Sequence, residues 1–460
     1  MAQFTSSEVR RHFSPAASLA ALGMHLRQID LFAPIRDTVK IVQKTVKHTP
    51  LDKLYDAFIS ILAGAHGLVE INTRLRSDPA LQSAFGRSAC AEQSVVQDTL
   101  NACTTEQVTQ LEQALQTIYR QHSQGYAHDY QQDWQILDAD LTGMPCGKKA
   151  ACATKGYFPK QRYRRGRQLG RVLATRYHEI VVDQLFNGTT YLRTALCPLI
   201  TAAAQILDLD QEKRARTIVR IDAGGGSVGE INWLLAQGYQ VMAKDYSGQR
   251  AQKLAQSVTT WVDDPRIEGR QVGWVRAPTS AYVREVRRIA VRCRKQNGQW
   301  GIGVLISTLD TAEVLLLTGQ SQAKVTDDAT VLLAYVYFYD QRGGGVETAF
   351  KDDKQGLGIT KRNKKRFEAQ QMVMLLNVLA HNVLIWARRW LAPNLPQIQR
   401  YGLVRLVRDV WHISGFVERD GQGHLTRIVL NQLAPLARGL GMALRRLLAP
   451  TQVVINLGQT

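Results

Sequence analysis

Three acidic residues stand where a metal-dependent site for phosphodiester cleavage could be assembled. Asp140 ends a strand-like segment at 134–140 and Asp222 ends another at 217–222, whereas Glu347 lies in a helical stretch far downstream. Such chemistry uses hard oxygen ligands around two Mg²⁺ or Mn²⁺ ions, roughly 3.5–4 Å apart. Two carboxylates at strand ends and a third on a helix packed over the sheet can converge on such a pair. A lone Asp at a strand end is more often a turn residue, so the prediction depends on the surrounding sequence.

The first carboxylate could also be Asp138, which lies two residues before Asp140 on the same predicted strand. Residues two apart on a strand face the same side of the sheet, so both side chains would point the same way. We favour Asp140 because the strand ends there and the turn-like sequence Asp140-Leu-Thr142 follows.

A basic segment follows the first acid. Between Leu141 and His178 there are ten Lys and Arg residues and no Asp or Glu, and aromatic residues are interleaved among the cations. A solvated basic loop would explain the composition, but a track for nucleic-acid phosphates explains it better. The residues of this segment that we expect to bind DNA are Lys148, Lys149, Lys160, Arg162, Arg164, Arg165 and Arg167.

The segment around Glu347 adds a second group of charges. On a helix Glu347, Lys351 and Lys354 are spaced i, i+4 and i+7 and share one face. One carboxylate beside two ammonium groups could hold a metal-bound phosphate, and an exposed helix with salt-bridging pairs is the equal alternative. A further basic run follows at 361–366.

The composition favours a polyanionic partner. The 460 residues include 58 Lys and Arg against 39 Asp and Glu, which gives a net charge of +19 and a pI near 9.8. Nucleic acid is the most common partner of such a chain. A hydrophobic content of 45% excludes wholesale disorder. The six cysteines form no C-x-x-C pair, which indicates reduced structural thiols and neither a zinc site nor a disulfide framework.

Targeting and membrane segments are not expected. The N-terminus is polar, with Arg10 and Arg11 and no apolar signal-peptide core. The long apolar run from Met372 to Leu391 contains Asn377, His381 and other polar groups, so it predicts a buried core helix better than a membrane span. We therefore expect a soluble, cytoplasmic and nucleoid-associated protein with no membrane partner.

The periodicity of the apolar residues changes along the chain. From about residue 14 to 130 they recur at helical spacing, with helix starts at Thr49-Pro50 and Thr104. Strand-like segments follow at 134–140, 179–185, 217–222, 238–244, 271–275, 289–293 and 300–307. A helix at 230–237 between two of these strands makes a βαβ unit, and the sequence at 420–423 predicts the turn of a C-terminal hairpin.

Several motifs of the chain resemble those of a known family. The pattern Tyr339-x2-Arg342…Glu347-x6-Lys354 resembles the Tyr-Arg-Glu-Lys signature of bacterial insertion-sequence transposases of the DDE type. The segments 137–142 and 220–224 are similar to the strands that carry the family's first two carboxylates. The segments 155–157 and 187–189 match the block between them, and 74–81 resembles the helical leader. The likeness covers most of residues 50–390.

The resemblance implies an α/β protein with an RNase H-like mixed-sheet core, an inserted β-rich subdomain and an all-helical N-terminal region. It implies a DNA transposase in which Asp140, Asp222 and Glu347 are catalytic and bind two Mg²⁺ or Mn²⁺ ions. Tyr339, Arg342, Lys351 and Lys354 would contact DNA. Trp274 and Trp300 could stack on an unpaired base, although most such Trp residues belong to a core.

The partners implied are double-stranded DNA, as the terminal inverted repeats of the element and as target, and a second copy of the chain in a homodimer that holds both ends. The segments implied are 1–130 for DNA binding and dimerisation, 131–250 for the first part of the catalytic core, 251–330 for the β-rich insertion, 331–395 for the core helices with the third acid, and 396–460 for a C-terminal hairpin and helix.

One feature departs from the family pattern. The family usually places three residues between the Arg and the Glu, whereas Gly343-Gly344-Gly345-Val346 make four here. We expect the extra glycine to be absorbed in a loop before the helix, which leaves the spacing from Glu347 to Lys354 unchanged.

Two other functions are compatible with parts of the sequence. Gly224-x-Gly226-x-x-Gly229 follows a strand and precedes a helix, and Asp245 ends the next strand, as in nucleotide-binding or S-adenosylmethionine-dependent Rossmann-like enzymes such as methyltransferases. Such a unit normally opens its domain, whereas this one lies mid-chain after a basic segment. The other alternative is a catalytically inactive DNA-binding relative, but all three acids are present.

Overall fold

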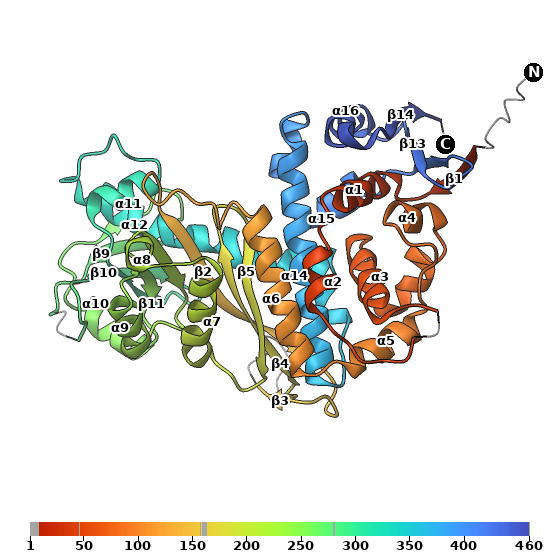
Figure 1. Cartoon of the computed structure of the whole chain (residues 1–460). Coiled ribbons are helices and arrows are strands. Elements are labelled where there is room, and N and C mark those ends of the chain that lie inside the picture. The colour runs from red at the N-terminus through yellow and green to blue at the C-terminus, as the bar shows by residue number, and fades with distance from the viewer. Residues whose placement is uncertain (1–8, 46, 157, 159–162, 279–280, 460) are drawn as a thin grey trace, which may run out of the picture. The chain divides into compact units, whose positions relative to one another are not determined.

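The computed structural model describes residues 9–45, 47–156, 158, 163–278 and 281–459. The chain forms two compact units (Figure 1). Unit 1 consists of Met1–Ser123, Lys149–Ala151 and Lys351–Thr460, and unit 2 consists of Gln124–Lys148 and Cys152–Phe350. The N-terminal and C-terminal parts of the sequence therefore belong to one unit, and the middle of the sequence forms the other.

Unit 2 is built on a mixed β-sheet that has ten strands over the described residues. The order is β3-β4-β2-β6-β7-β11-β10-β9-β8, and β5 also pairs with β4. β2 is antiparallel to β4 and parallel to β6, β6 is parallel to β7, and β7 is antiparallel to β11. The strands are β2 (Gln135–Pro145), β3 (Thr154–Lys155), β4 (Arg165–Ala174), β5 (Glu179–Asn187), β6 (Thr217–Ile221), β7 (Gln240–Lys244), β8 (Val262–Asp263), β9 (Arg270–Trp274), β10 (Arg287–Arg294) and β11 (Trp300–Ser307).

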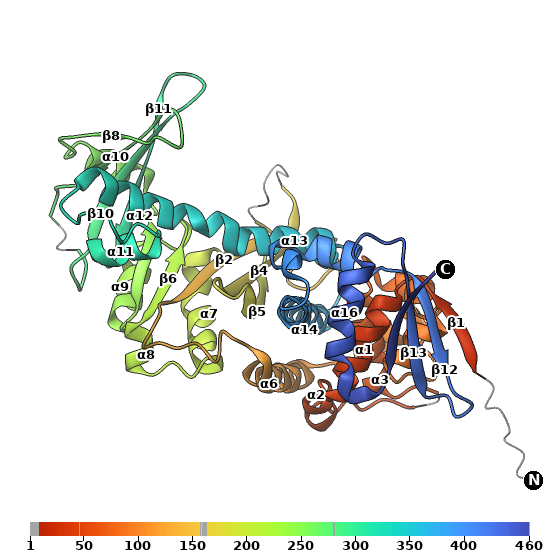
Figure 2. The same ribbon diagram turned by 90° about the horizontal axis from the view of Figure 1, so that it is seen from above.

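Helices cover both faces of this sheet. β6 is buried at every position, as a central parallel strand covered on both sides must be. Figure 2 shows α12 along one face of the sheet and α7 and α9 on the other. The helices of unit 2 are α7 (Leu192–Ile206), α8 (Gln211–Ala215), α9 (Val228–Ala236), α10 (Gly248–Ala255), α11 (Thr311–Leu317) and α12 (Asp328–Arg342).

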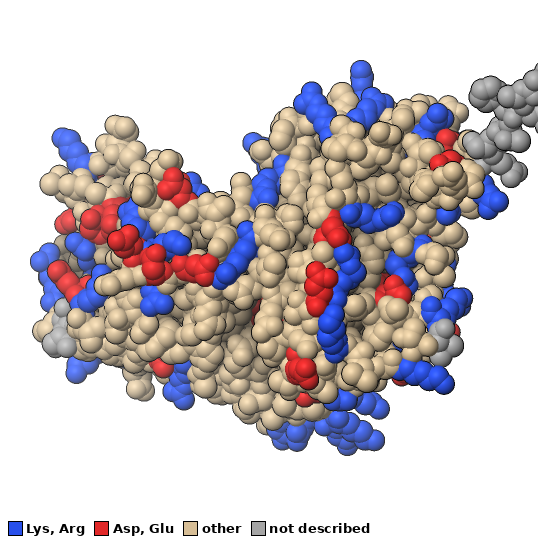
Figure 3. Space-filling model, in the orientation of Figure 1, with Lys and Arg blue, Asp and Glu red and all other residues tan. Residues whose placement is uncertain are grey.

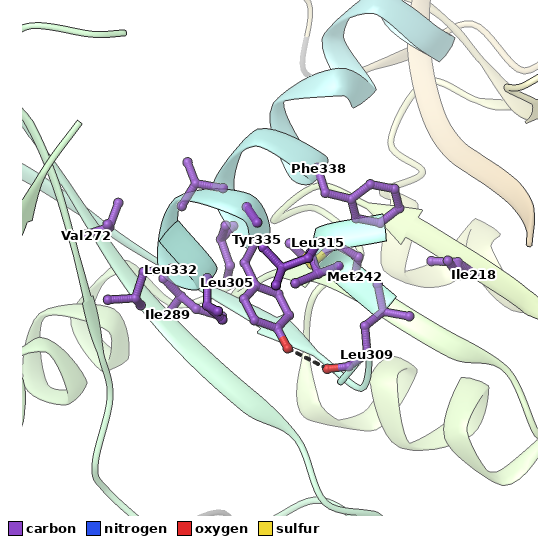
Figure 4. Packing of buried hydrophobic residues seen from close by; sticks show 14 of the residues in the cluster. Ile218, Met242, Val272, Ile289, Leu305, Leu309, Leu315, Leu332, Tyr335 and Phe338 are labelled. Carbon is purple, nitrogen blue, oxygen red and sulfur yellow. Dashed lines mark hydrogen bonds between the residues drawn. The ribbon is translucent and has the colours of Figure 1, made fainter. Parts of the chain in front are cut away.

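A hydrophobic cluster fixes α12 on the sheet. Leu332, Tyr335 and Phe338 of α12 pack against buried side chains of β6, β7, β9, β10 and β11 (Figure 4). The Tyr335 hydroxyl donates a hydrogen bond of 2.7 Å to the carbonyl of Leu309. Asp327 caps the N-terminus of α12 by accepting from the backbone N–H of Thr330. The C-terminal end of α12 is thereby held at a defined position over β2 and β6.

Unit 1 surrounds one long helix. α14 (Phe367–Leu391) packs against α3, α5 and α6. Thr49 and Thr104 cap α3 and α6 as predicted, each through a capping box. The other helices are α1 (Ala17–Gln28), α2 (Ala33–Thr38), α3 (Pro50–Leu62), α4 (Pro79–Ala84), α5 (Gln93–Ala102), α6 (Thr105–His122), α15 (Leu403–Arg405) and α16 (Ala437–Leu447); α13 (Thr348–Gly356) runs from the end of unit 2 into unit 1.

A small sheet completes unit 1. Its order is β1-β12-β13-β14, with strands β1 (Arg10–Ser14), β12 (Gly415–Arg419), β13 (Leu425–Asn431) and β14 (Val454–Gly458). β12 and β13 form the predicted hairpin. Over the described residues, α14 is the one helix long and apolar enough to cross a membrane, and 94% of its most apolar window is buried, as expected for a core helix.

The mixed α/β class is confirmed, and three details differ from the sequence analysis. The N-terminal region is not all-helical, because β1 pairs with β12. Residues 165–174, which the sequence analysis assigned to an exposed basic track, form β4, a strand paired on both edges. The strands of 251–330 continue the main sheet, since β11 pairs with β7 through Leu305 and Lys244. Short or arginine-rich strands lack the apolar alternation on which the sequence-based assignment relies.

Candidate active site

The first two acids are neighbours on adjacent parallel strands. The register of β2 and β6 pairs Ala139 with Ile221. Asp222 directly follows the end of β6, whereas Asp140 lies within β2, which continues to Pro145, so the prediction that a strand ends at Asp140 was wrong. Neighbouring strands lie about 4.8 Å apart, and residues paired in register face the same side. The pKa of Asp140 is raised to about 6, mainly by burial; Arg342 opposes the shift, and the charge of Asp222 adds to it. The two carboxylates therefore interact directly.

Arg342 connects the first acid to the third. Its Nη2 lies 2.8 Å from Asp140 Oδ2, and its Nη1 lies 2.7 Å from Glu347 Oε1. The side chain of Arg342 is 4% exposed, that of Asp140 17% and that of Glu347 57%. Burial alone would lower the pKa of Arg342, but the charges of Asp140 and Asp222 raise it above its ordinary value. Arg342 thus contacts two of the three predicted acids, and the third, Asp222, lies close enough to influence its pKa.

A kink accommodates the extra glycine between Arg342 and Glu347. α12 ends at Arg342, and Gly343–Glu347 form a π-like turn before α13 begins. Two helices meet at this turn, because Gly345 within it has non-helical dihedral angles. The extra residue is therefore taken up in a non-helical break before α13, close to the expected loop, and Glu347 still reaches Arg342.

Gly345 is the residue on which this turn depends. Its backbone departs from helical geometry, with φ −91° and ψ −110°. A Cβ at this position would overlap Asp138 Oδ2 and lie 2.9 Å from Thr175 Cγ2. The third of the three glycines is therefore required by close packing on β2, whereas Gly343 and Gly344 face open space.

The structure separates Asp138 from Asp140. Asp138 is fully buried and forms a two-point ion pair with Arg220, whose Nε lies 2.7 Å from Oδ1 and whose Nη2 lies 2.9 Å from Oδ2. The Thr175 hydroxyl donates a third hydrogen bond of 2.7 Å to Asp138. A carboxylate with every oxygen engaged by the protein is a poor metal ligand. Asp140 is the better candidate, as the sequence analysis favoured.

Tyr339 also belongs to this cluster. It lies one turn before Arg342 on α12. Burial raises the pKa of Tyr339 above its ordinary value, Arg342 opposes this, and the charges of Asp222, Glu347 and Asp140 add to it. The phenol therefore lies within electrostatic reach of all three acids.

The other predicted DNA-contact residues fall into four groups. Lys148, Lys149, Arg164 and Arg165 are exposed, as a phosphate contact requires. The side chain of Arg167, on β4, is only 1% exposed, which does not fit a contact with a DNA phosphate. Lys160 and Arg162 lie outside the described residues. Lys351 is exposed and Lys354 partly buried, both on α13 in unit 1.

The neighbouring basic residues have acidic partners that the sequence analysis missed. Arg171, on the same face of β4 as Arg167, forms a buried ion pair of 2.7 Å with Asp183. Arg176 pairs with Asp133. These acids lie outside the segment 141–178, which is why its composition showed no counter-charge. Figure 3 shows acidic side chains gathered over α11 and α12, so the surface of unit 2 is not uniformly basic.

The two tryptophans suggested for base stacking differ in environment. Trp274 donates to Asp328 and packs edge-on against Tyr335, so it belongs to the core beneath α12. Trp300 is 37% exposed and lies over the guanidinium of Arg292, 4.6 Å from ring centroid to Cζ.

The glycine-rich turn after β6 does not resemble a dinucleotide site. A Cβ on Gly226 would overlap the carbonyl oxygen of Lys244, and one on Gly225 would lie 3.1 Å from Leu192, so these glycines allow close packing within the protein. Asp245, the residue that would bind a ribose, is 4% exposed and engaged by Arg250 at 2.7 Å and 2.8 Å.

A hard divalent cation would need oxygen ligands such as those of Asp140 and Glu347. Among the described residues, no three His, Cys, Asp or Glu side chains already form a cluster that could hold a metal ion. Asp140 and Glu347 instead both form ion pairs with Arg342, whose guanidinium lies between them where a metal ion could otherwise bind. Carboxylate oxygens from three elements are the donor set that Mg²⁺ and Mn²⁺ prefer.

Comparison with known proteins identifies the family. A family model described as Transposase DDE domain group 1 matches residues 19–448, nearly the whole chain. The chain therefore belongs to this family of DDE transposases. A search of curated proteins found no match. Among solved structures, the chain is similar to the piggyBac transposase in its synaptic complex with hairpin DNA, with 11% identity and a TM-score of 0.46 over 87% of this chain and 82% of that chain.

Proposed function

We propose that the chain is a DNA transposase that cuts DNA at the ends of its element and joins the ends to target DNA, with Asp140, Asp222 and Glu347 as its catalytic acids. The observation that carries this proposal is the bridge of Arg342 from Asp140 to Glu347, beside Asp222. Family membership supports the class of chemistry, and the contacts of Arg342 support the choice of these residues among the 39 Asp and Glu of the chain.

The strand order supports an RNase H-like core. Within the large sheet, β5-β4-β2-β6-β7 consists of an antiparallel three-strand meander followed by two parallel strands. Two acids lie at the adjacent strands β2 and β6, and the third follows a helix packed across the sheet. The strands β11, β10, β9 and β8, in the interval between Asp222 and Glu347, would be the β-rich insertion, joined to the core by strand pairing.

The three acids would hold two Mg²⁺ or Mn²⁺ ions. When bound, such ions supply a water or hydroxyl activated for attack and charge stabilisation for the leaving oxygen. The chain itself would position the DNA. Arg342 and Tyr339 lie beside the acids, and a guanidinium matches the geometry of two phosphate oxygens. Lys148, Arg164 and Arg165 are exposed cations that would bind the DNA backbone.

Unit 1 would supply further contacts with the element ends. Residues 361–460 contain 15 Lys and Arg against 4 Asp and Glu, although some are buried or paired. We assign DNA binding and dimerisation to the helices of 1–130 and extend the DNA contacts to this C-terminal region. A homodimer would hold both ends, since each must be cut and joined in a concerted way. The C-terminal hairpin lies in the same unit as these helices.

Replacement of the third acid tests the proposal. Glu347→Gln should abolish Mg²⁺-dependent cleavage of DNA that carries the sequences flanking the gene, and DNA affinity should remain. Glu268→Gln, an exposed glutamate of unit 2 outside the cluster, is the matched control and should cleave normally. Unchanged cleavage by Glu347→Gln would refute the assignment.

A further inference from the structure

Two arginines beside β2 differ in how completely they are bonded. Arg220 engages Asp138 with Nε and Nη2 and donates from Nη1 to the Phe338 carbonyl at 2.8 Å. Arg342 divides its two terminal nitrogens between Asp140 and Glu347, and among the described residues its buried Nε has no hydrogen-bond partner. Arg214 Nε and Arg288 Nε are also without a hydrogen-bond partner among the described residues, but only Arg342 Nε belongs to a guanidinium that contacts two of the proposed catalytic acids. The Arg342 bridge therefore leaves room for a better acceptor.

The atoms that Arg342 occupies are those that a metal ion would need. Its nitrogens contact Asp140 Oδ2 and Glu347 Oε1, one oxygen from each of two proposed ligands. A guanidinium and a divalent cation cannot share these oxygens at close range, since like charges a few ångströms apart repel strongly at a partly buried site. Arg342 in this position and a metal ion bound to both acids exclude each other.

We infer that Arg342 is an internal counter-ion that keeps the metal site closed in the DNA-free protein and is drawn off the carboxylates by a DNA phosphate. The inference rests on the proposed function and adds a regulatory step to it. The phosphate is the chemistry that a guanidinium binds with two parallel hydrogen bonds, and it offers the acceptors that Nε lacks here. DNA binding would thereby open the metal site.

The local sequence allows Arg342 to move. Arg342 is the last residue of α12. Gly343 and Gly344 follow it, and a Cβ added to either would have no neighbour within 4 Å. Two glycines in open space can change their dihedral angles at low cost. Glu347 is 57% exposed, so its side chain can also reorient. Arg220, by contrast, lies in the middle of β6 and is held on both sides by neighbouring strands.

The arrangement has a thermodynamic consequence. If DNA raises the metal affinity of the site by a given factor, metal must raise DNA affinity by the same factor. Such coupling would keep the site without metal until DNA is present, which restricts cleavage to the bound complex. The coupling should disappear when position 342 carries no charge.

The affinity for a metal ion, measured in the absence of any cleavage reaction, tests the inference. Free Mn²⁺ can be measured by electron paramagnetic resonance in titrations of the full chain without DNA. Arg342→Gln should bind Mn²⁺ at least about tenfold more tightly than the wild type, because one unit of positive charge has been removed from the site. Arg270→Gln is the matched control, since Arg270 also bridges two carboxylates, those of Asp264 and Asp340, and should gain no comparable site.

A second measurement needs no substitution at Arg342. A duplex oligonucleotide should increase the Mn²⁺ affinity of the wild type, after subtraction of the Mn²⁺ that the same duplex binds with Asp140→Asn protein. If Arg342→Gln and the duplex both leave a Mn²⁺ site that depends on Asp140 unchanged, the counter-ion inference is overturned and the metal site stands. If no Mn²⁺ binding depends on Asp140 in any of these samples, the proposed function itself fails.

Discussion

Asp138 and Asp140 share one face of β2, but they have different partners. Both oxygens of Asp138 accept hydrogen bonds from Arg220, whereas Asp140 forms an ion pair with Arg342, which also pairs with Glu347. Asp138 is fully buried, and both its oxygens are engaged. The side chain of Asp140 is 17% exposed and its pKa is raised to about 6, mainly by burial. Two identical residues two positions apart therefore have different roles, one structural and one suited to chemistry.

Exchange of each carboxylate for an amide should separate these roles. Asp138→Asn breaks a buried ion pair and leaves Arg220 without its counter-charge, which should lower the free energy of unfolding by about 3–5 kcal/mol. Asp140→Asn should change it by about 1 kcal/mol or less and should abolish end cleavage. Urea denaturation and a cleavage assay on the two purified variants provide the comparison. Equal losses of stability would contradict the distinction.

The three glycines before Glu347 should respond differently to alanine. Gly345→Ala forces a Cβ onto Asp138, which should cost about 1–3 kcal/mol of stability. Gly343→Ala adds a methyl group in open space at helical dihedral angles, φ −60° and ψ −34°, and should be neutral or stabilise by up to about 1 kcal/mol. Thermal and chemical unfolding of both variants measures the difference, and a harmless Gly345→Ala would show that the π turn is not held by this packing.

Unit 1 should lose stability in mild acid because of His25. Burial lowers the pKa of His25 to about 4, and the nearby His122 contributes in the same direction. In the unfolded chain His25 binds a proton near pH 6.5, whereas in the folded chain it does so only near pH 4. The free energy of unfolding should therefore fall as the pH drops from about 6.5 to about 4. This contribution is at most about 3 kcal/mol. His25→Phe keeps an aromatic ring against Trp390 and should flatten that part of the profile.

Denaturation curves measured at several pH values give this profile directly. The wild type and His25→Phe should differ most near pH 4 and converge above about pH 7, where the histidine is neutral in both states. Parallel profiles for the two proteins would show that His25 does not cause the acid sensitivity.

Exposed and buried arginines around β4 should affect DNA binding and stability separately. Arg164→Ala and Arg165→Ala should weaken DNA binding with little dependence on DNA sequence and should each reduce the salt dependence of the logarithm of the binding constant by about 0.9. Arg167→Ala should instead lower stability by about 1–3 kcal/mol, because its side chain is buried. Fluorescence anisotropy at several salt concentrations measures the first effect. A reduced salt slope for folded Arg167→Ala would restore its assignment as a phosphate contact.

The sequence alone determined where most strands lie. It placed Asp222 directly after β6, and β6 and β7 lie within a few residues of the predicted segments, whereas β2 continues five residues past Asp140 to Pro145. The capping residues of α3 and α6 and the turn of the β12–β13 hairpin were also predictable, because each depends on local chemistry within a few residues. The family resemblance rested on the same local motifs.

Tertiary structure decided which charges face one another. Asp138 meets Arg220 across 82 positions of sequence, and Arg342 reaches the Ala139 carbonyl across 203. Arg167 and Arg171 look like surface cations in the sequence, but in the folded protein both side chains are buried. Local periodicity specifies the secondary structure of a segment, whereas the ionisation and availability of a charged side chain depend on desolvation and on partners that only folding brings close.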